Sequence, residues 1–346
     1  MRFWKTIKDW MLPIAMVAGA SVYLIYAVLP EPIHKAGPVL AEIVALMQPM
    51  LIFAMLFLTF CRIEPKDLKP HRWHWWLLLV QGGIFTLLGL AAFLIQKVMP
   101  GISFGWIVVL ESAMLCMICP TATAAAVVTR KLGGDVPGIT TYVVLINLVT
   151  ALLVPLVVPM VHPASDADFW TSFSLILAKV FPLLITPCLC AWLVRYLLPK
   201  LHRKILRFPD LPFYLWAVAL TLAITITTKS LVHTDMKIGL IMGMSLVSLV
   251  CCAFQFALGR HVGGRYRPHR RMSLEEEEQG REARKVTAGQ SLGQKNTVFA
   301  IWMAYTFMTP ETAIVGGLYS IWHNVYNSWQ LYRANHQPTA STNRDS

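Results

Sequence analysis

The stretch CPTATAAAVVTR, residues 119–130, interrupts a long hydrophobic segment midway, and GQSLGQKN, residues 289–296, interrupts a second one in the same manner. In the first stretch Pro120 removes a backbone donor and clashes with the preceding helical turn. In the second, Gly289 and Gly293 loosen a helix more gently. Both segments are therefore predicted to be broken helices.

The composition around these stretches is that of a polytopic membrane protein. Of 346 residues, 56% are hydrophobic and only 14% are charged, with a mean hydropathy of +0.56. A soluble domain carries roughly 25% charged residues. The net charge of +12 sits in short loops between apolar runs. The chain has no basic face and no recognition helix, so this positive charge indicates how the chain is oriented in a membrane. The lipid bilayer is therefore the expected partner, and nucleic acid is not.

Ten apolar runs are long enough to span a bilayer as helices. They lie near 10–30, 36–60, 74–98, 103–129, 137–161, 170–196, 210–230, 237–259, 286–308 and 311–332. The first run is too long for a cleaved signal and is expected to be retained. The predicted fold is all-α, with ten transmembrane helices.

A loop without lysine, at 162–169, divides the chain into a five-span half at 1–161 and a second half at 162–333, followed by a disordered tail at 334–346. An odd number of spans makes the halves inverted repeats. The two broken segments are then spans 4 and 9, which are equivalent in the two halves. Broken helices at matching places in two repeats indicate a secondary transporter with its binding site near the membrane midplane.

The basic residues predict the orientation, since cytoplasmic loops carry the excess of Lys and Arg. Alternate loops and the two ends hold 24 of the 30, while the opposite loops hold only Lys35, Lys97, Lys229 and Lys237. Both termini are predicted to be cytoplasmic in a multi-pass protein of the cell (inner) membrane. The charged loop 261–285 is expected to carry a short surface helix that starts with a capping box, Ser273 to Glu276, and leads into span 9.

Ionisable side chains at bilayer depth are functional candidates because they are costly to bury. Four occur: Glu42, near enough to the outer end of span 2 to reach water; Glu111; Lys179, which could meet a substrate anion or Glu111; and Lys295. Lys295 is expected to line the transport site, because it lies in the interrupted stretch of span 9. The full set predicted for substrate binding or coupling is Lys295, Asn296, Gln294, Ser291, Gln290, Thr121, Thr123, Asn147, His323 and Asn324.

No enzyme is predicted, since the chain has no HExxH, no GxSxG and no suggestive pair of carboxylates. Cys116 and Cys119 form a CxxC, but no second CxxC or His pair accompanies it, so no metal site or other cofactor is expected.

Three pieces of sequence carry a family resemblance: CPTATAAAVVTRKLGGD at 119–135, GQKN at 293–296 and SIWHN at 320–324. Together, in this order and at these spans, they resemble the bile acid:sodium symporter family. The resemblance implies a panel domain of spans 1, 2, 6 and 7 and a core domain of spans 3–5 and 8–10, with the two broken helices crossing in the core. It also implies sodium-coupled uptake of amphipathic or small carboxylates as one domain rocks against the other.

The chain departs from this family at the positions that the resemblance assigns to sodium. The family's Ser-Asn pair falls on Ala125 and Ala126, its span 9 glutamate on Ser291, and the following glutamine on Lys295. Alanine supplies no oxygen ligand, and the Lys295 ammonium would repel a nearby cation. The remaining candidates to hold sodium are Gln81, Ser291 and Gln294.

The sequence thus predicts a secondary active transporter of an organic anion of the bile acid, keto acid, pantoate or sulfated steroid class. The Lys295 ammonium is expected to replace one sodium ion, so that transport is coupled to protons or uncoupled. The alternatives are a sodium-coupled symporter that uses the remaining oxygens and a passive facilitator or channel. A membrane sensor is a further alternative, if loop 261–285 binds a partner.

Overall fold

The computed structural model describes residues 11–30, 35, 37–99, 101, 104–162, 168–208, 210–266 and 274–336. Within these residues every regular element is a helix, apart from one isolated bridge between Thr121 and Lys295. The helices are α2 (Met11–Val28), α4 (Gly37–Phe60), η1 (Pro65–Asp67), α5 (Arg72–Val98), α6 (Phe104–Ile118), α7 (Ala125–Lys131), α8 (Val136–Val161), α9 (Phe169–Leu197), α10 (Pro199–Leu206), α11 (Leu211–Val232), α12 (Ile238–Arg265), α13 (Leu274–Gly293), α14 (Thr297–Phe307) and α15 (Pro310–His336). The all-α prediction is confirmed for this part of the chain.

Six of the described helices are long and apolar enough to cross a membrane, namely α4, α5, α8, α9, α11 and α12. Shorter apolar helices lie within α2, α6 and α14. The predicted fourth span is the broken pair α6 and α7, and the predicted ninth span is the broken pair α13 and α14. The apolar runs therefore located the helices well, and the two interruptions fall where small and polar residues occur.

Two boundaries differ from the sequence prediction. The second interruption begins only after Gly293, so Gly289 lies inside α13. The helix predicted to lead into span 9 is the first part of α13, which runs without a break from Leu274 to Gly293; the capping-box residue Ser273 lies outside the described residues. The predicted disordered tail begins too early, since α15 continues to His336.

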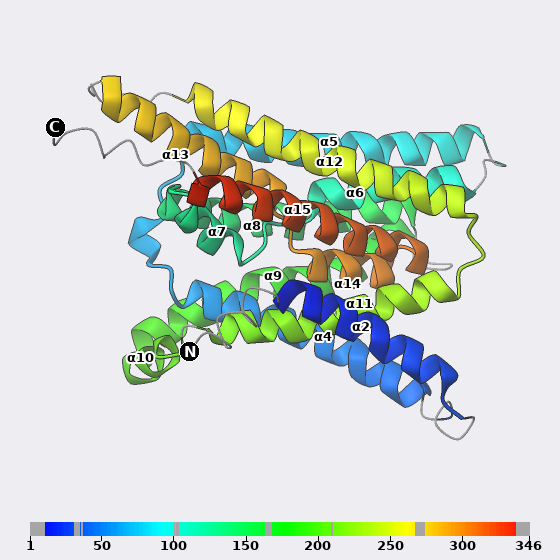
Figure 1. The fold of residues 1–346 in the computed structure, drawn as a ribbon. Helices are drawn as coiled ribbons and strands as arrows, with labels where there is room; N and C mark the ends of the chain where they lie inside the picture. The colour runs from blue at the N-terminus through cyan, green and yellow to red at the C-terminus, as the bar shows by residue number, and fades with distance from the viewer. Residues whose placement is uncertain are drawn as a thin grey trace.

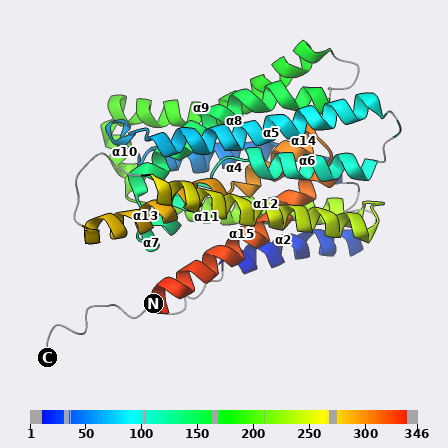
Figure 2. The same ribbon diagram turned by 90° about the horizontal axis from the view of Figure 1, so that it is seen from above.

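The helices form two layers (Figure 1). In one, which we call the four-helix layer, α4 packs against α9 and α11, and α11 packs against α2. The other, the broken-helix layer, contains α5 to α8 and α12 to α15, and its helices surround the two interruptions. The layers meet where α9 packs on α8 and where α11 packs on α14 and α15. Figure 2 shows the same arrangement from above.

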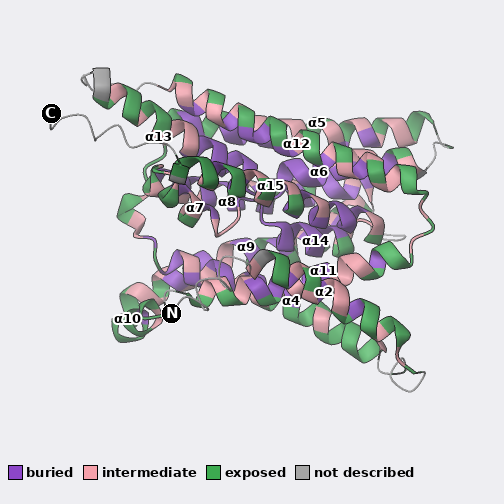
Figure 3. Cartoon of the chain, viewed as in Figure 1, coloured by how far each residue is buried: buried purple, intermediate pink, exposed green. Residues whose placement is uncertain are grey.

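Burial is concentrated in the broken-helix layer, around α6, α8, α14 and α15 (Figure 3). Exposed residues lie on the outward faces of the outer helices, where large apolar side chains such as Leu79 and Val250 are 64% and 57% exposed. This is the pattern of a bundle whose outer surface faces lipid and whose interior holds the polar groups.

Glycines bring α12 and α13 into close contact. A Cβ atom on Gly259 would lie 2.3 Å from the Ala288 carbonyl oxygen, and one on Gly263 would lie 2.3 Å from that of Arg284. Small residues four apart are the usual means by which membrane helices approach closely. At the end of α13 a Cβ on Gly293 would lie 2.4 Å from the Phe256 ring. Gly293 therefore fixes where α13 rests on α12.

Candidate site at the crossing of two broken helices

The two interruptions lie against each other, although they are about 170 residues apart in the chain. Thr121 and Lys295 form an antiparallel bridge. The Ala122 amide donates to the Gln294 carbonyl at 2.9 Å, and the Asn296 amide donates to the Pro120 carbonyl at 2.8 Å. Non-helical backbone at membrane depth must find such partners, because no water is there to replace them. The two breaks thus supply hydrogen-bond partners for each other's free backbone groups.

Side chains reinforce this contact from both chain segments. The Thr121 hydroxyl donates to the Ser291 carbonyl at 2.5 Å, and the Cys119 thiol donates to the Asn296 carbonyl at 2.9 Å. The Asn296 side chain caps α14 by accepting from the Phe299 amide at 3.2 Å. An N-cap asparagine is favoured at a helix start because it satisfies an otherwise unpaired amide, so Asn296 ends the second break.

The last carbonyls of α6 each receive a side-chain donor. A helix end leaves its final carbonyls without partners inside the helix, and here three helices and the second interruption supply them. The donors are Gln255 to Cys116 at 3.2 Å, Lys295 to Met117 at 3.2 Å, Thr150 to Ile118 at 3.1 Å and Gln81 to Cys119 at 3.1 Å. The carbonyl end of a helix carries partial negative charge. Of the four donors, only Lys295 brings a cation to it.

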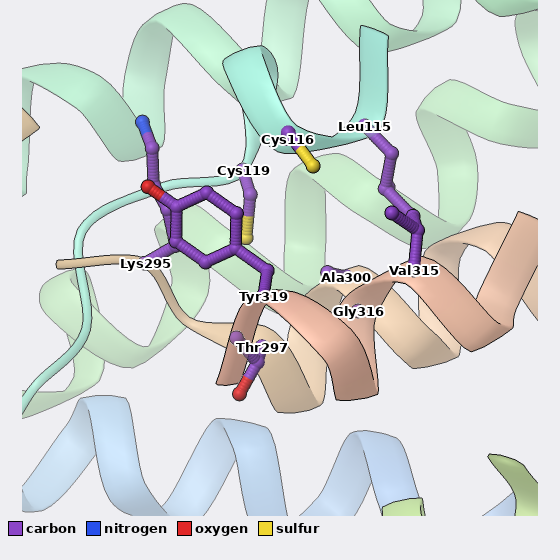
Figure 4. Close-up of a pocket in the computed structure, with 9 residues that line it drawn as sticks. All are labelled: Leu115, Cys116, Cys119, Lys295, Thr297, Ala300, Val315, Gly316 and Tyr319. Atoms are coloured by element: carbon purple, nitrogen blue, oxygen red, sulfur yellow. The ribbon is translucent and has the colours of Figure 1, made fainter. Parts of the chain in front are cut away.

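Lys295 is almost completely enclosed, with 1% of its surface exposed. Within the described residues no carboxylate lies within ion-pair distance of its ammonium group. It borders a small cavity of about 10 Å³, room for roughly one water, together with Cys116, Cys119 and Tyr319 (Figure 4). The carbonyl end of α6 therefore takes the place that a carboxylate usually has beside a buried lysine.

Three buried oxygens, two on the last turn of α13 and one just after it, have no hydrogen-bond partner among the described residues: Gln290 Oε1, Ser291 Oγ and Gln294 Oε1. They are acceptors that a cation or a water molecule would satisfy. Gln81, the other predicted sodium ligand, already uses its side-chain oxygen to accept from Tyr142 at 2.8 Å.

The donor set fits a sodium ion poorly. The two predicted ligands with free oxygens, Ser291 and Gln294, are both neutral, and Lys295 follows them directly in the chain. No group of three or more His, Cys, Asp or Glu residues that could hold a metal occurs in the described part of the molecule. Within the described residues no carboxylate pairs with the Lys295 ammonium, so its positive charge is not offset by a formal negative charge and would disfavour a nearby sodium ion.

The other predicted site residues fall into two groups. Near the crossing, His323 accepts from the Lys295 amide at 3.4 Å, and Gln290 donates to Asn327 at 2.9 Å. Asn147 and Asn324 instead donate to carbonyls of their own helices, at 2.7 Å and 2.6 Å. Thr123 is half-buried in the first interruption.

Sequence reasoning missed the partners of Glu111. This carboxylate is fully buried, accepts from the Thr312 hydroxyl at 2.6 Å and is hydrogen-bonded to the His162 ring. Lys179, considered as a partner for it, lies instead over the Phe307 ring, 5.7 Å from its centre. Little in the sequence indicated this contact, because His162 is only the residue that follows an apolar run.

Tyr319 and Thr150 were also missed, and both serve the crossing. Tyr319 donates to the Gly293 carbonyl at 2.8 Å, and Thr150 donates to α6. No local pattern marked either residue, because their acceptors are far away in the sequence.

An all-helical bundle with several apolar, membrane-length helices and two broken helices that cross in its interior is an integral membrane protein of the transporter class. Residues 11–335 match the model of the SBF-like CPA transporter family, which is related to the bile acid:sodium symporters, and the chain belongs to this family. The resemblance found in the sequence is thereby confirmed. None of the curated proteins matches the chain in sequence.

Proposed function

We propose that this protein is a secondary transporter of an organic anion that works by alternating access. Membership of a transporter family and the crossing of two broken helices support this proposal. Paired helix breaks expose half-helix ends at the membrane midplane, where transporters of this kind bind substrate and coupling ions. The ten predicted spans would form two inverted five-helix repeats, with both termini cytoplasmic.

The two layers are the natural moving bodies. Each is held together by its own helix contacts, and the layers meet mainly through α8 with α9 and through α11 with α14 and α15. We assign the four-helix layer to the panel and the broken-helix layer to the core. Alternating access in such folds is largely a rocking of one bundle against the other around a fixed site.

The coupling ion is proposed to differ from that of the sodium symporters. The observation that carries this proposal is the contact of the Lys295 ammonium with the Met117 carbonyl at 3.2 Å. This is the negative end of a half-helix, the position where a mobile coupling cation would be stabilised. Because the lysine ammonium is a permanent part of the chain, it can stabilise this helix end without a sodium ion that binds and dissociates in each transport cycle. Transport would then be driven by protons, with Lys295 as the group that gains and loses one, or proceed uncoupled.

The substrate is proposed to be a small or amphipathic organic anion, such as a bile acid, a keto acid, pantoate or a sulfated steroid. The cavity beside Lys295, at about 10 Å³, is far below the roughly 300–1,000 Å³ of a typical small-molecule pocket. Lys295 is therefore enclosed in this conformation. Substrate would reach the crossing when the two layers move apart.

One observation favours a second candidate, a sodium-coupled symporter. The unpartnered oxygens of Gln290, Ser291 and Gln294 lie close together in the chain, where α13 ends and the second interruption begins. Hard cations take oxygen ligands, so these three would be the remaining parts of a sodium site.

A two-stage experiment tests the proposed function. Taurocholate, pantoate, pyruvate and a sulfated steroid are screened by thermal shift of the purified protein in choline chloride. An anion at about 100 times its dissociation constant stabilises by roughly 2.7 kcal/mol, which identifies the substrate. Its uptake is then measured in proteoliposomes under an inward proton gradient, an inward sodium gradient or none.

Accumulation of the anion without sodium is the expected result. Accumulation that strictly requires sodium would establish the second candidate in its place. Equilibration of the anion with no accumulation under any gradient would mean a passive facilitator. If no anion binds or moves, the transport proposal is wrong, and the sensor alternative is tested by deleting loop 261–285.

A further inference from the structure

A cleft of about 590 Å³ opens between the start of α5 and the end of α12, away from the crossing. Its walls are basic and aromatic. The lining residues are Pro70, His71, Arg72, Trp73, Trp76, His261, Val262, Arg265 and Tyr266. The volume is within the range of pockets that hold a small molecule or a headgroup.

The cleft lies at a membrane surface. Both α5 and α12 are long and apolar enough to cross a membrane, and the cleft is formed by the first turns of one and the last turns of the other. Trp75 and Trp76, on the first turns of α5, are 56% and 60% exposed. Exposed tryptophans at helix ends sit at the level of the lipid headgroups. Whatever occupies the cleft therefore meets headgroups on one side.

Charge is left unbalanced inside it. Arg72 on α5 and Arg265 on α12 both line the cleft and are both exposed. Within the described residues neither forms an ion pair, while the nearby Glu282 is paired with Arg260 and Lys285. The described lining contains no carboxylate. An anion is thus the complement that the cleft lacks.

We propose that this cleft binds the phosphate headgroup of an anionic phospholipid from the adjacent leaflet. Arg72 and Arg265 would hold the phosphate, since guanidinium groups bind phosphate with paired hydrogen bonds. Trp73 and Trp76 would contact the glycerol and the first acyl carbons. Basic pockets between membrane helices are suited to anionic headgroups because the surface charge of the leaflet and the local cations act together. The bound lipid would tie α5 to α12 within the broken-helix layer.

The test measures lipid binding by the full-length protein. Purified protein in phosphatidylcholine nanodiscs is titrated with phosphatidylglycerol, and bound lipid is counted by native mass spectrometry. The double variant Arg72→Gln/Arg265→Gln is compared with Arg203→Gln/Lys204→Gln on α10, which removes two exposed positive charges outside the cleft. Inorganic phosphate and glycerol phosphate are tested in parallel as free anions.

We expect wild type to retain phosphatidylglycerol and the cleft variant to bind it roughly 25-fold more weakly, about fivefold for each arginine. The α10 variant should bind as wild type does. Equal loss in both variants would show that general surface charge, and no particular site, attracts the lipid. Saturable binding of inorganic phosphate that displaces the lipid would assign the cleft to a soluble anion and overturn the proposal. Arg72→Lys/Arg265→Lys, which keeps the charge, should retain most of the binding and guards against simple misfolding.

Discussion

The two helix interruptions are built from different residues, although they lie against each other. The first is the longer, running from the end of α6 at Ile118 to the start of α7 at Ala125, and it consists of Cys, Pro, Thr and Ala residues. The second occupies only Gln294 to Asn296, between α13 and α14, and contains a lysine.

The two breaks differ in charge and not in the direction of their hydrogen bonds. Each break donates to the other: the Ala122 amide of the first donates to the Gln294 carbonyl, and the Asn296 amide of the second donates to the Pro120 carbonyl. Only the second break brings a formal charge, the Lys295 ammonium, which donates to the Met117 carbonyl at the end of α6. Neither would be stable at membrane depth without the other. A substitution at the second break should therefore lower the stability of the fold more than a substitution at the first.

The largest effect is expected from Lys295→Glu. It would place a carboxylate against the carbonyl end of α6, and an uncompensated buried charge costs about 3–5 kcal/mol. Thermal unfolding in detergent measures the loss. The control is Lys204→Glu, the same charge reversal at an exposed lysine on α10, outside the membrane-length helices, which should change stability little. If both variants unfold at the same temperature, the crossing does not depend on the charge of Lys295.

A smaller loss is expected from Gly293→Ala, which tests how tightly the second break is anchored. The new Cβ would lie 2.4 to 2.6 Å from three atoms of the Phe256 ring. Such overpacking costs about 1–3 kcal/mol. Gly83→Ala in α5 is the matched control, because a Cβ there meets nothing within 4 Å. That variant should gain about 0.5–1 kcal/mol, so opposite shifts in melting temperature are the expected result, and equal shifts would argue against the close contact.

The smallest effect is expected at the first break, from Thr121→Val. This variant loses the hydrogen bond to the Ser291 carbonyl, worth about 0.5–1.5 kcal/mol. Thr123→Val, at a half-buried position in the same break, should stay within about 0.5 kcal/mol of wild type. A loss at Thr121 that exceeds the loss at Gly293 would reverse the ranking of the two breaks.

Local signals predicted much of this architecture from the sequence. The apolar runs gave the helices, and Pro120 gave the end of α6 because a proline acts on its own preceding turn. One of the glycines was misinterpreted. Gly289 was predicted to break the helix, but it lies inside α13, whereas Gly293 is the last residue of α13; both make room for α12. Whether a glycine breaks its own helix or lets a second helix approach depends on the neighbouring helix. No local sequence pattern carries that information.

The partners of the charged groups were out of reach for the same reason. Lys295 was recognised as a site residue from its place in a break, yet its contact with Met117 joins positions 178 residues apart. The pairing of Glu111 with His162 joins positions 51 apart. Sequence identified the costly buried charges, and only the packing of the helices shows what compensates each one.

The central claim is that the Lys295 ammonium takes the place of a coupling sodium ion at the carbonyl end of α6. Its most direct test is uptake of the identified anion into proteoliposomes, with sodium or with choline, by wild type and by Lys295→Gln. Glutamine keeps a donor for the Met117 carbonyl and removes the charge. The account predicts that wild-type uptake is the same in sodium and in choline, and that Lys295→Gln is stimulated by sodium. Full sodium dependence of the wild type would contradict it.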